Sequence, residues 1–289
     1  MSEKTPIATE AKSQAKLERF PRSNILPTQT PMFWVQQKDR YLRQLLIRDI
    51  EETTGRRLIV YFANRFQPSD IDHRDVSIMP EVLHDLKGAP ADLFLETGGG
   101  MTDATEGLVS LISNTISDLR VIVPRAAKSN GTLLALASRS ILMGATSELG
   151  PIEPAVQGIP STILETPEIA AQNFPLHMFG KYALQQTRAL AKALLENGMM
   201  KGQDQNRIEV AIQALSSRDR YHSHGSVIDY KEAQALGLSV EFLPPEGDLW
   251  QRLWLLYSMY DFDVRQSNYL KVFEGRASST AVAAPPEAP

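Results

Sequence analysis

Residues 92–102 read DLFLETGGGMT, and residues 120–144 read RVIVPRAAKSNGTLLALASRSILMG. In each stretch a short apolar run is followed by small and polar residues and then by a helical pattern. LIVYFA at residues 58–63 extends the same alternation toward the N-terminus. Short buried strands that alternate with amphipathic helices predict an α/β fold with a mostly parallel sheet. Because ligands in such folds lie at the carboxyl ends of strands, we expect a site at loops 97–102 and 125–132.

The composition is that of a soluble globular protein. Of 289 residues, 43% are hydrophobic and 22% are charged, and 30 basic residues against 34 acidic ones leave a net charge of −4, which argues against nonspecific nucleic-acid binding. No apolar run reaches the ~18 residues of a membrane helix, and the start does not resemble a signal peptide, so the sequence predicts a cytoplasmic protein without a membrane segment. The chain has no cysteine, so any nucleophile is an oxygen or an amine.

The remaining segments extend this organisation. Helical patterns cover residues 30–54, 75–87, 166–197 with a break at Pro175, 203–215 and 248–262, and residues 225–243 predict a strand, a helix and a strand. The polar segment 1–27 and the Ala- and Pro-rich segment 274–289 predict disordered tails around a single domain at 28–273. Four aromatic residues near the end have helical spacing, which indicates an internal core stripe or, alternatively, a subunit contact: Trp250, Trp254, Tyr257 and Tyr260.

The glycine loop consists of Gly98, Gly99 and Gly100, between a predicted strand and a predicted helix. Such a loop leaves backbone N–H groups unhindered at the positive end of a helix, which suits an oxyanion or a phosphate. Neither GxGxxG nor GxxxxGK[ST] is present, so no nucleotide cofactor is predicted. A tight turn without a ligand is the alternative.

Ser129 stands between a predicted strand and an apolar helix, where the helix dipole favours developing negative charge. It is either a nucleophile or simply the N-cap of that helix. A serine nucleophile needs a base, and no histidine lies between Ser129 and His177. Lys181, within FGKYALQQTRALAKALL at residues 179–195, is the candidate base if it is desolvated; the alternative is a lysine on a solvated helix face.

His222 and His224 lie two residues apart in a segment that precedes a predicted strand at Val227. Two histidines alone are a weak metal signal, because no third ligand accompanies them at a regular spacing, and no metal is predicted. The pair is either part of a loop or a second source of the base.

Four stretches, taken in order, resemble the serine dehydrogenase proteinase family: LFLETGGGMTDAT (93–105), VPRAAKSNGTLLALASRSILMGATSELGPIEP (123–154), FGKYALQQTRAL (179–190) and SHGSVIDYKEAQALGLSV (223–240). That family is grouped with signal-peptide peptidase A and the proteolytic subunit of Clp protease in the Clp/crotonase fold. The likeness runs from about residue 58 to 243. It implies an α/β fold of repeated ββα and βαβ units.

The resemblance also implies a serine endopeptidase with a Ser/Lys dyad. Ser129 matches the nucleophile, and Lys181, 181 − 129 = 52 residues later, matches the base. Gly99 and Gly100, with the amide of Asn130, match the oxyanion hole. The family further implies a peptide or unfolded-protein substrate, membrane proteins included, a homo-oligomer, and no cofactor.

Two positions depart from the family pattern. Gly98 replaces the usual proline, and Asn130 replaces the small residue that commonly follows the nucleophile. Two alternatives therefore stay open. One is a crotonase-like acyl-CoA enzyme that uses the same oxyanion loop with an acidic or histidine base, and the other is a catalytically silent Clp-fold scaffold.

Overall fold

The computed structural model describes residues 30–86 and 88–285, and its centre is a seven-stranded sheet. In spatial order the strands are β11 (Ser279–Ala283), β10 (Tyr269–Glu274), β1 (Arg57–Ala63), β2 (Ala91–Glu96), β3 (Leu119–Val123), β5 (Ser140–Met143) and β9 (Val240–Phe242). From β1 to β9 every pairing is parallel, and β10 and β11 add antiparallel. The predicted α/β fold with a mostly parallel sheet is confirmed.

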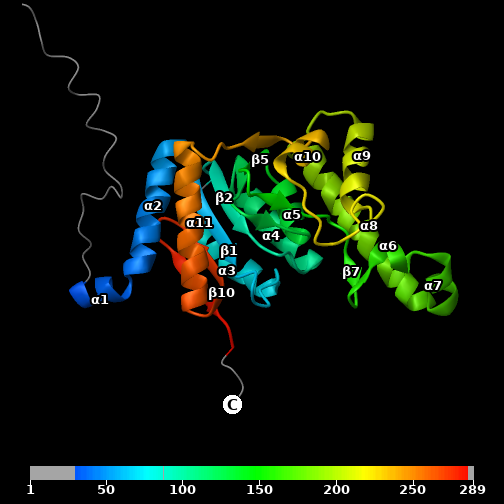
Figure 1. Ribbon diagram of the computed structural model, residues 1–289, viewed down its shortest axis with the longest axis horizontal. Coiled ribbons are helices and arrows are strands. Elements are labelled where there is room, and N and C mark those ends of the chain that lie inside the picture. The colour runs from blue at the N-terminus through cyan, green and yellow to red at the C-terminus, as the bar shows by residue number, and fades with distance from the viewer. Residues whose placement is uncertain (1–29, 87, 286–289) are drawn as a thin grey trace, which may run out of the picture.

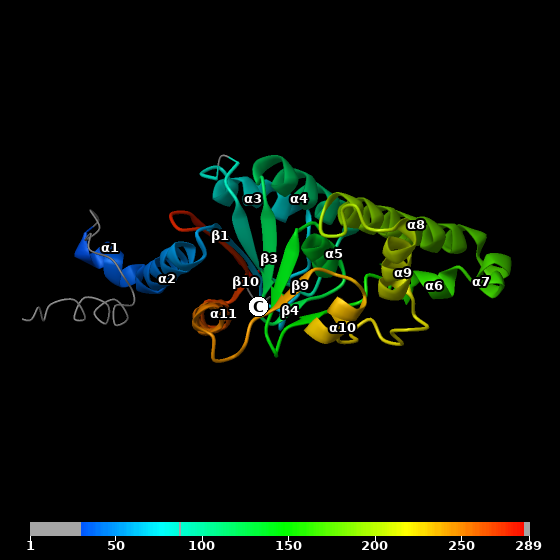
Figure 2. The ribbon, with the colours of Figure 1, turned by 90° about the horizontal axis from the view of Figure 1, so that it is seen from above.

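Helices cover both faces of this sheet (Figures 1 and 2). One face packs against α2 (Lys38–Thr54), which follows α1 (Pro31–Gln36), and against α11 (Asp248–Gln266). The other face is covered by α3 (His73–Leu83), α4 (Thr102–Thr115), α5 (Asn130–Leu136), α8 (Phe174–Asn197), α9 (Gln205–Ser216) and α10 (Tyr230–Ala235). Because both faces are buried, β1 and β2 are apolar on both sides rather than alternating.

Smaller elements surround the main sheet. β4 (Ala126–Ala127) pairs parallel with β6 (Glu148–Leu149), and β7 (Ala155–Val156) pairs antiparallel with β8 (Ile159–Pro160). α6 (Ser161–Leu164) and α7 (Pro167–Gln172) follow, and with the start of α8 they form an arm at the end of the molecule farthest from α2 (Figures 1 and 2). The predicted break is confirmed, since α7 ends before Asn173 and Pro175 lies in the first turn of α8.

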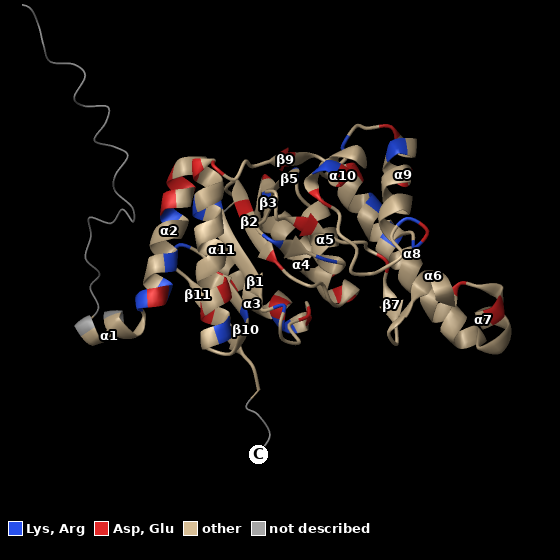
Figure 3. Cartoon of the chain, in the orientation of Figure 1, with Lys and Arg blue, Asp and Glu red and all other residues tan. Residues whose placement is uncertain are grey.

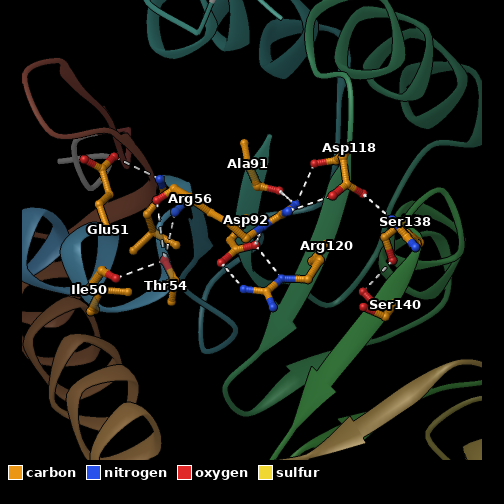
Figure 4. A network of polar contacts seen from close by, with 12 residues as sticks. Ile50, Glu51, Thr54, Arg56, Ala91, Asp92, Asp118, Arg120, Ser138 and Ser140 are labelled. Atoms are coloured by element: carbon orange, nitrogen blue, oxygen red, sulfur yellow. Dashed lines mark hydrogen bonds and ion pairs between the residues drawn. The ribbon is translucent and has the colours of Figure 1, made fainter. Parts of the chain in front are cut away.

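A network of ion pairs fixes the amino ends of three neighbouring strands (Figure 4). Arg56 donates to Asp92 at 2.6 Å and to Asp118 at 2.7 Å. Arg120 binds both carboxylate oxygens of Asp92, each at 2.8 Å, and Asp92 is 1% exposed. These ion pairs occupy the amino ends of β1, β2 and β3. A ligand-binding site on the same strands is therefore expected at their carboxyl ends.

Two expectations are corrected. Residues 226–229 form no regular strand, because only Ile228 pairs, in an isolated bridge with Leu149. The predicted disordered tail at 274–289 is wrong at 279–283, which form β11 at the sheet edge; residues 286–289 and the predicted N-terminal tail, 1–27, lie outside the described residues. Ile228 pairs with a residue distant in the chain, and β11 pairs with the neighbouring β10, which itself is a strand through its pairing with the distant β1.

The aromatic helix α11 is mainly a core element. Trp250 is 6% exposed and Tyr260 is fully buried, whereas Trp254 is 37% exposed, so the core stripe predicted there is confirmed for two of its aromatic residues.

Charged residues of both signs are mixed along α2 on the same side of the sheet (Figure 3). Within the described ranges, no helix combines the length and the apolar character needed to cross a bilayer.

Candidate active site

Ser129 occupies a strained turn between β4 and α5, with φ 52° and ψ −120°. Among the non-glycine residues that the structure describes, only Gln157 and Asn268 share a positive φ with it. A residue held in such a conformation costs about 1–3 kcal/mol, and a sharp strand-to-helix turn of this kind is typical of an exposed serine nucleophile. The hydroxyl makes no capping hydrogen bond to α5, so Ser129 occupies the N-cap position but its side chain does not cap the helix.

The glycine loop lies directly against this serine. Gly99 has φ 102°, and a Cβ atom on it would lie 2.8 Å from the Ser129 Cβ and 3.2 Å from the Asn130 backbone nitrogen. Gly100 has φ 154°, and a Cβ atom there would lie 2.3 Å from the Ile71 nitrogen. Neither position tolerates a side chain without displacement of the backbone, so only glycine allows this close approach.

Two backbone N–H groups beside Ser129 are left free. The Gly99 N–H donates to the Thr97 hydroxyl at 3.1 Å, whereas no hydrogen bond within residues 30–86 and 88–285 uses the N–H of Gly100 or of Asn130. The Asn130 side chain instead fixes the loop, because its Nδ2 donates to the Gly100 carbonyl at 2.5 Å and to the Thr102 hydroxyl at 3.3 Å. This bracing role of Asn130 was not predicted from the sequence, since it depends on contact with a loop 30 residues earlier.

The strand that precedes the serine, β4, is tied to the end of β2. Thr97 donates its N–H to the Ala126 carbonyl at 3.0 Å and accepts from the Lys128 N–H at 3.1 Å. The Glu96 carboxylate accepts from the Ala126 N–H at 2.9 Å and from Arg65 at 3.3 Å. Burial raises the pKa of Glu96 to about 7, against the opposing effect of these two donors. Loops 97–102 and 125–132, which were predicted to lie together at the carboxyl ends of strands, are joined by these hydrogen bonds.

Glu96→Gln tests this raised pKa. Glu96 in the unfolded chain loses its proton near pH 4.3, while the folded protein keeps it up to about 7, so the free energy of unfolding falls as pH rises between these values. We expect the ionisation of Glu96 to lower the free energy of unfolding of the wild type by about 3 kcal/mol between pH 4 and pH 8. This decrease should be absent in Glu96→Gln. Urea unfolding at both pH values measures it. The exposed Glu246→Gln serves as the control and should follow the wild type; a parallel course of Glu96→Gln with the wild type would contradict the assignment.

Lys128, next to the serine, is a buried lysine whose contacts were not predicted from the sequence. Its Nζ donates to the carbonyls of Leu149 at 3.1 Å and Ser226 at 3.0 Å, and lies 3.4 Å from a Glu148 oxygen. Burial lowers its pKa, which the charge of Glu148 opposes. Leu149 and Ile228 also exchange backbone hydrogen bonds of 2.9 and 3.1 Å, so the segment with the two histidines is held against β6.

The two histidines differ in their surroundings. His222 is exposed, with its Nδ1 3.1 Å from the Arg218 carbonyl. The pKa of His224 is lowered by desolvation of its ring, although the residue as a whole is exposed; the charge of Glu153 opposes this shift, and those of Arg218 and Lys128 add to it. In the described part of the chain, no three metal-ligating side chains gather into a group.

Lys181 lies in the first half of α8 and is half-buried. Its neighbour Gly180 packs against Leu164, where a Cβ atom would come within 2.4 Å of the Leu164 Cβ. Further along α8, Gln186 donates to Asp103 at 2.8 Å and thereby joins this helix to the start of α4, just after the glycine loop. Among the described residues, no hydrogen bond or ion pair joins Lys181 to Ser129.

Comparison with known proteins identifies relatives in sequence. Two uncharacterized proteins of Methanocaldococcus jannaschii are similar: MJ0137, 29% identical over 64% of this chain and 65% of the relative, and MJ1495, 25% identical over 67% and 70%. The chain thus spans slightly less than two thirds of the first relative's length.

Two solved structures are also similar in outline. ClpP1 from Listeria monocytogenes has a TM-score of 0.41 with 15% identity over 67% of this chain and 95% of its own. A variant of the membrane-bound stomatin-specific protease 1510-N has a TM-score of 0.42 with 18% identity over 60% and 75%. Scores of this size do not carry the assignment, which rests on a family match over residues 66–274. That match covers strands β2, β3, β5 and β9 of the parallel sheet, the glycine loop and the serine turn, and it shows that the chain belongs to the ClpP-like SDH-type serine proteinases.

Proposed function

We propose that this protein is a serine endopeptidase whose nucleophile is Ser129. The observation that carries the proposal is the strained serine turn with Gly99 packed against it and two free N–H groups beside it. A carbonyl oxygen placed between the N–H groups of Gly100 and Asn130 would receive two hydrogen bonds. Each such donor is typically worth about 10²–10³ in rate.

In the proposed reaction, Lys181 as the neutral amine takes the proton from the Ser129 hydroxyl. The oxygen attacks the scissile carbonyl carbon, and the resulting oxyanion is held by the N–H groups of Gly100 and Asn130, with Gly99 providing the space. Collapse of this intermediate breaks the C–N bond, and the lysine returns its proton to the leaving amine. Water, deprotonated by the same lysine, then attacks the acyl ester; the C–O bond to Ser129 breaks, and the lysine returns the proton to the Ser129 oxygen.

His224 is the second candidate for the base. The observation in its favour is the position of its loop, which Lys128 and Leu149 hold against the strand pair β4 and β6 beside the nucleophile. The Ser/Lys assignment rests instead on the family resemblance and on the joining of α8 to α4 through Gln186.

An alkyl fluorophosphonate probe, which labels activated serines, tests the proposal when labelling is followed by intact mass. We expect the wild type to be labelled, and Lys181→Ala to be labelled about 10²–10⁴-fold more slowly, as for loss of a general base. Lys192→Ala, on the same helix, is the matched control and should be labelled like the wild type, because the Lys192 Nζ is paired with Glu209 of α9.

Three results would redirect the proposal. Slow labelling of His224→Ala with normal labelling of Lys181→Ala would assign the base to His224. No labelling of a folded wild type would remove the peptidase proposal in favour of the silent scaffold. Acyl-CoA retained in the purified, unlabelled protein would favour the acyl-CoA enzyme.

We also propose that the substrate is an extended peptide or unfolded protein and that the chain works as a homo-oligomer. Support for the oligomer comes from the arm, where large apolar side chains are exposed: Ile163 at 43%, Phe174 at 62%, Phe179 at 61% and Tyr182 at 58%. Exposed apolar side chains that gather in one region are typical of protein interfaces. Light scattering that reports a monomer at micromolar concentration would contradict this proposal.

A further inference from the structure

A buried lysine, aspartate and tyrosine form a cluster under the N-terminus of α3. Lys271 on β10 is 1% exposed, and its Nζ lies 2.8 Å from each carboxylate oxygen of Asp75, which is fully buried. The Tyr61 hydroxyl donates to the same carboxylate at 2.8 Å. A charged pair is costly to bury, and three hydrogen bonds from the Lys271 and Tyr61 side chains to the Asp75 carboxylate offset that cost.

The cluster continues to the segment that lies across the glycine loop. The Asp72 backbone N–H donates to Asp75 at 2.9 Å, and an Asp72 carboxylate oxygen lies 3.4 Å from the Lys271 Nζ. The preceding residue, Ile71, donates its N–H to the Gly99 carbonyl at 2.7 Å and accepts from the Met101 N–H at 2.9 Å. Gly100 lies between these two hydrogen bonds, with no space for a Cβ atom against Ile71.

A chemically similar cluster lies on the other face of the same strand. Arg43 donates to Glu274 at 2.8 Å, Glu274 is fully buried, and the Tyr260 hydroxyl donates to that carboxylate at 2.8 Å. Arg43 also pairs with Asp263. These residues come from α2, β10 and α11, and none of their hydrogen bonds within the described residues reaches the glycine loop.

We propose that Lys271 and Asp75 are positioning residues for the glycine loop: through Asp72 and Ile71 they hold Gly99, Gly100 and Met101 at the distance from Ser129 that oxyanion binding needs. For its catalytic consequence the inference rests on the proposed function. The free N–H of Gly100 belongs to the peptide between the two hydrogen bonds to Ile71, so a shift of Ile71 shifts that donor. A misplacement of about 1 Å costs on the order of 10²-fold in rate.

The experiment compares variants of the two clusters. Lys271→Met leaves Asp75 without its cation. The double variant, Lys271→Met with Asp75→Asn, removes both charges and is used if the single variant does not fold. The matched controls are Arg43→Met and Arg43→Met with Glu274→Gln. Amide hydrogen exchange at Ile71 and Met101 is measured in every variant, together with the maximal rate and the half-saturating concentration of fluorophosphonate labelling.

We expect the Lys271 variants to lose at least about tenfold of the exchange protection at Ile71 and Met101. Their maximal labelling rate should fall by about 10–100-fold while the half-saturating probe concentration stays unchanged. The Arg43 variants should be destabilised to a similar extent and keep both the protection and the labelling rate. This contrast separates positioning from a general loss of stability.

Two outcomes would overturn the inference. One is unchanged exchange at Ile71 and Met101 in the Lys271 variants, and the other is an equal loss in both sets of variants. If the wild type itself is not labelled, the proposed function fails, and the exchange measurement still decides whether the cluster holds the loop.

Discussion

Ser129→Ala is expected to abolish fluorophosphonate labelling and to lower peptide hydrolysis by at least ~10³-fold, because it removes the only atom that forms the acyl-enzyme. Intact mass after incubation with the probe measures the first effect, and release of new amino termini from an unfolded protein substrate measures the second. Ser161→Ala is the matched control. Ser161 also begins a helix, is fully buried, and has a hydroxyl without a hydrogen-bond partner among the described residues, so its removal should leave labelling unchanged.

The same position allows a stability measurement that does not depend on activity. Glycine adopts φ 52° and ψ −120° without steric strain, whereas alanine does not. Ser129→Gly should therefore be as inactive as Ser129→Ala but more stable by about 1 kcal/mol in urea unfolding. Equal stability of the two variants would show that the turn is not strained, and labelling of Ser129→Ala at the wild-type rate would exclude Ser129 as the nucleophile.

Gly99→Ala is expected to lower the labelling rate by about 10²–10³-fold, the effect of losing one oxyanion donor. The added Cβ atom would lie 2.8 Å from both the Lys128 carbonyl oxygen and the Ser129 Cβ, and the residue would keep a φ of 102° that alanine disfavours. The loop must then move away from the serine, which separates the two free N–H groups. Labelling kinetics, with circular dichroism to verify folding, measure the effect.

Gly98→Ala provides the control within the same loop. A Cβ atom at Gly98 meets nothing within 4 Å, and its φ lies outside the left-handed region. We expect its labelling rate to stay within about twofold of the wild type, as for a surface substitution. If Gly98→Ala and Gly99→Ala are equally slow, the loop acts through general flexibility rather than through contact with Ser129.

The parts of the fold that were predictable are those encoded locally. Apolar runs such as LIVYFA and RVIVP are strands because both of their faces are buried, and the break before α8 follows from Pro175, which is accommodated in a first helical turn. In contrast, strands β10 and β11 were not predicted from the sequence. Lys271 and Glu274 interrupt the apolar pattern of β10, and only their buried partners, Asp75 and Arg43, make those charges tolerable in a strand.

The candidate site divides in the same way. The placement of Ser129 at a strand-to-helix turn and of three glycines in a loop before a helix was predictable, because both depend on the order of neighbouring residues. That only glycine fits at 99 and 100 follows instead from contacts with Ser129 and Ile71, which are distant in the chain. How these parts are held depends on tertiary contacts: Lys128 binds a carbonyl 98 residues later, and Lys271 binds a carboxylate 196 residues earlier. Such contacts form between segments that the chain brings together only on folding, and their energy comes from desolvation and pairing of charges, which no local pattern of residues records.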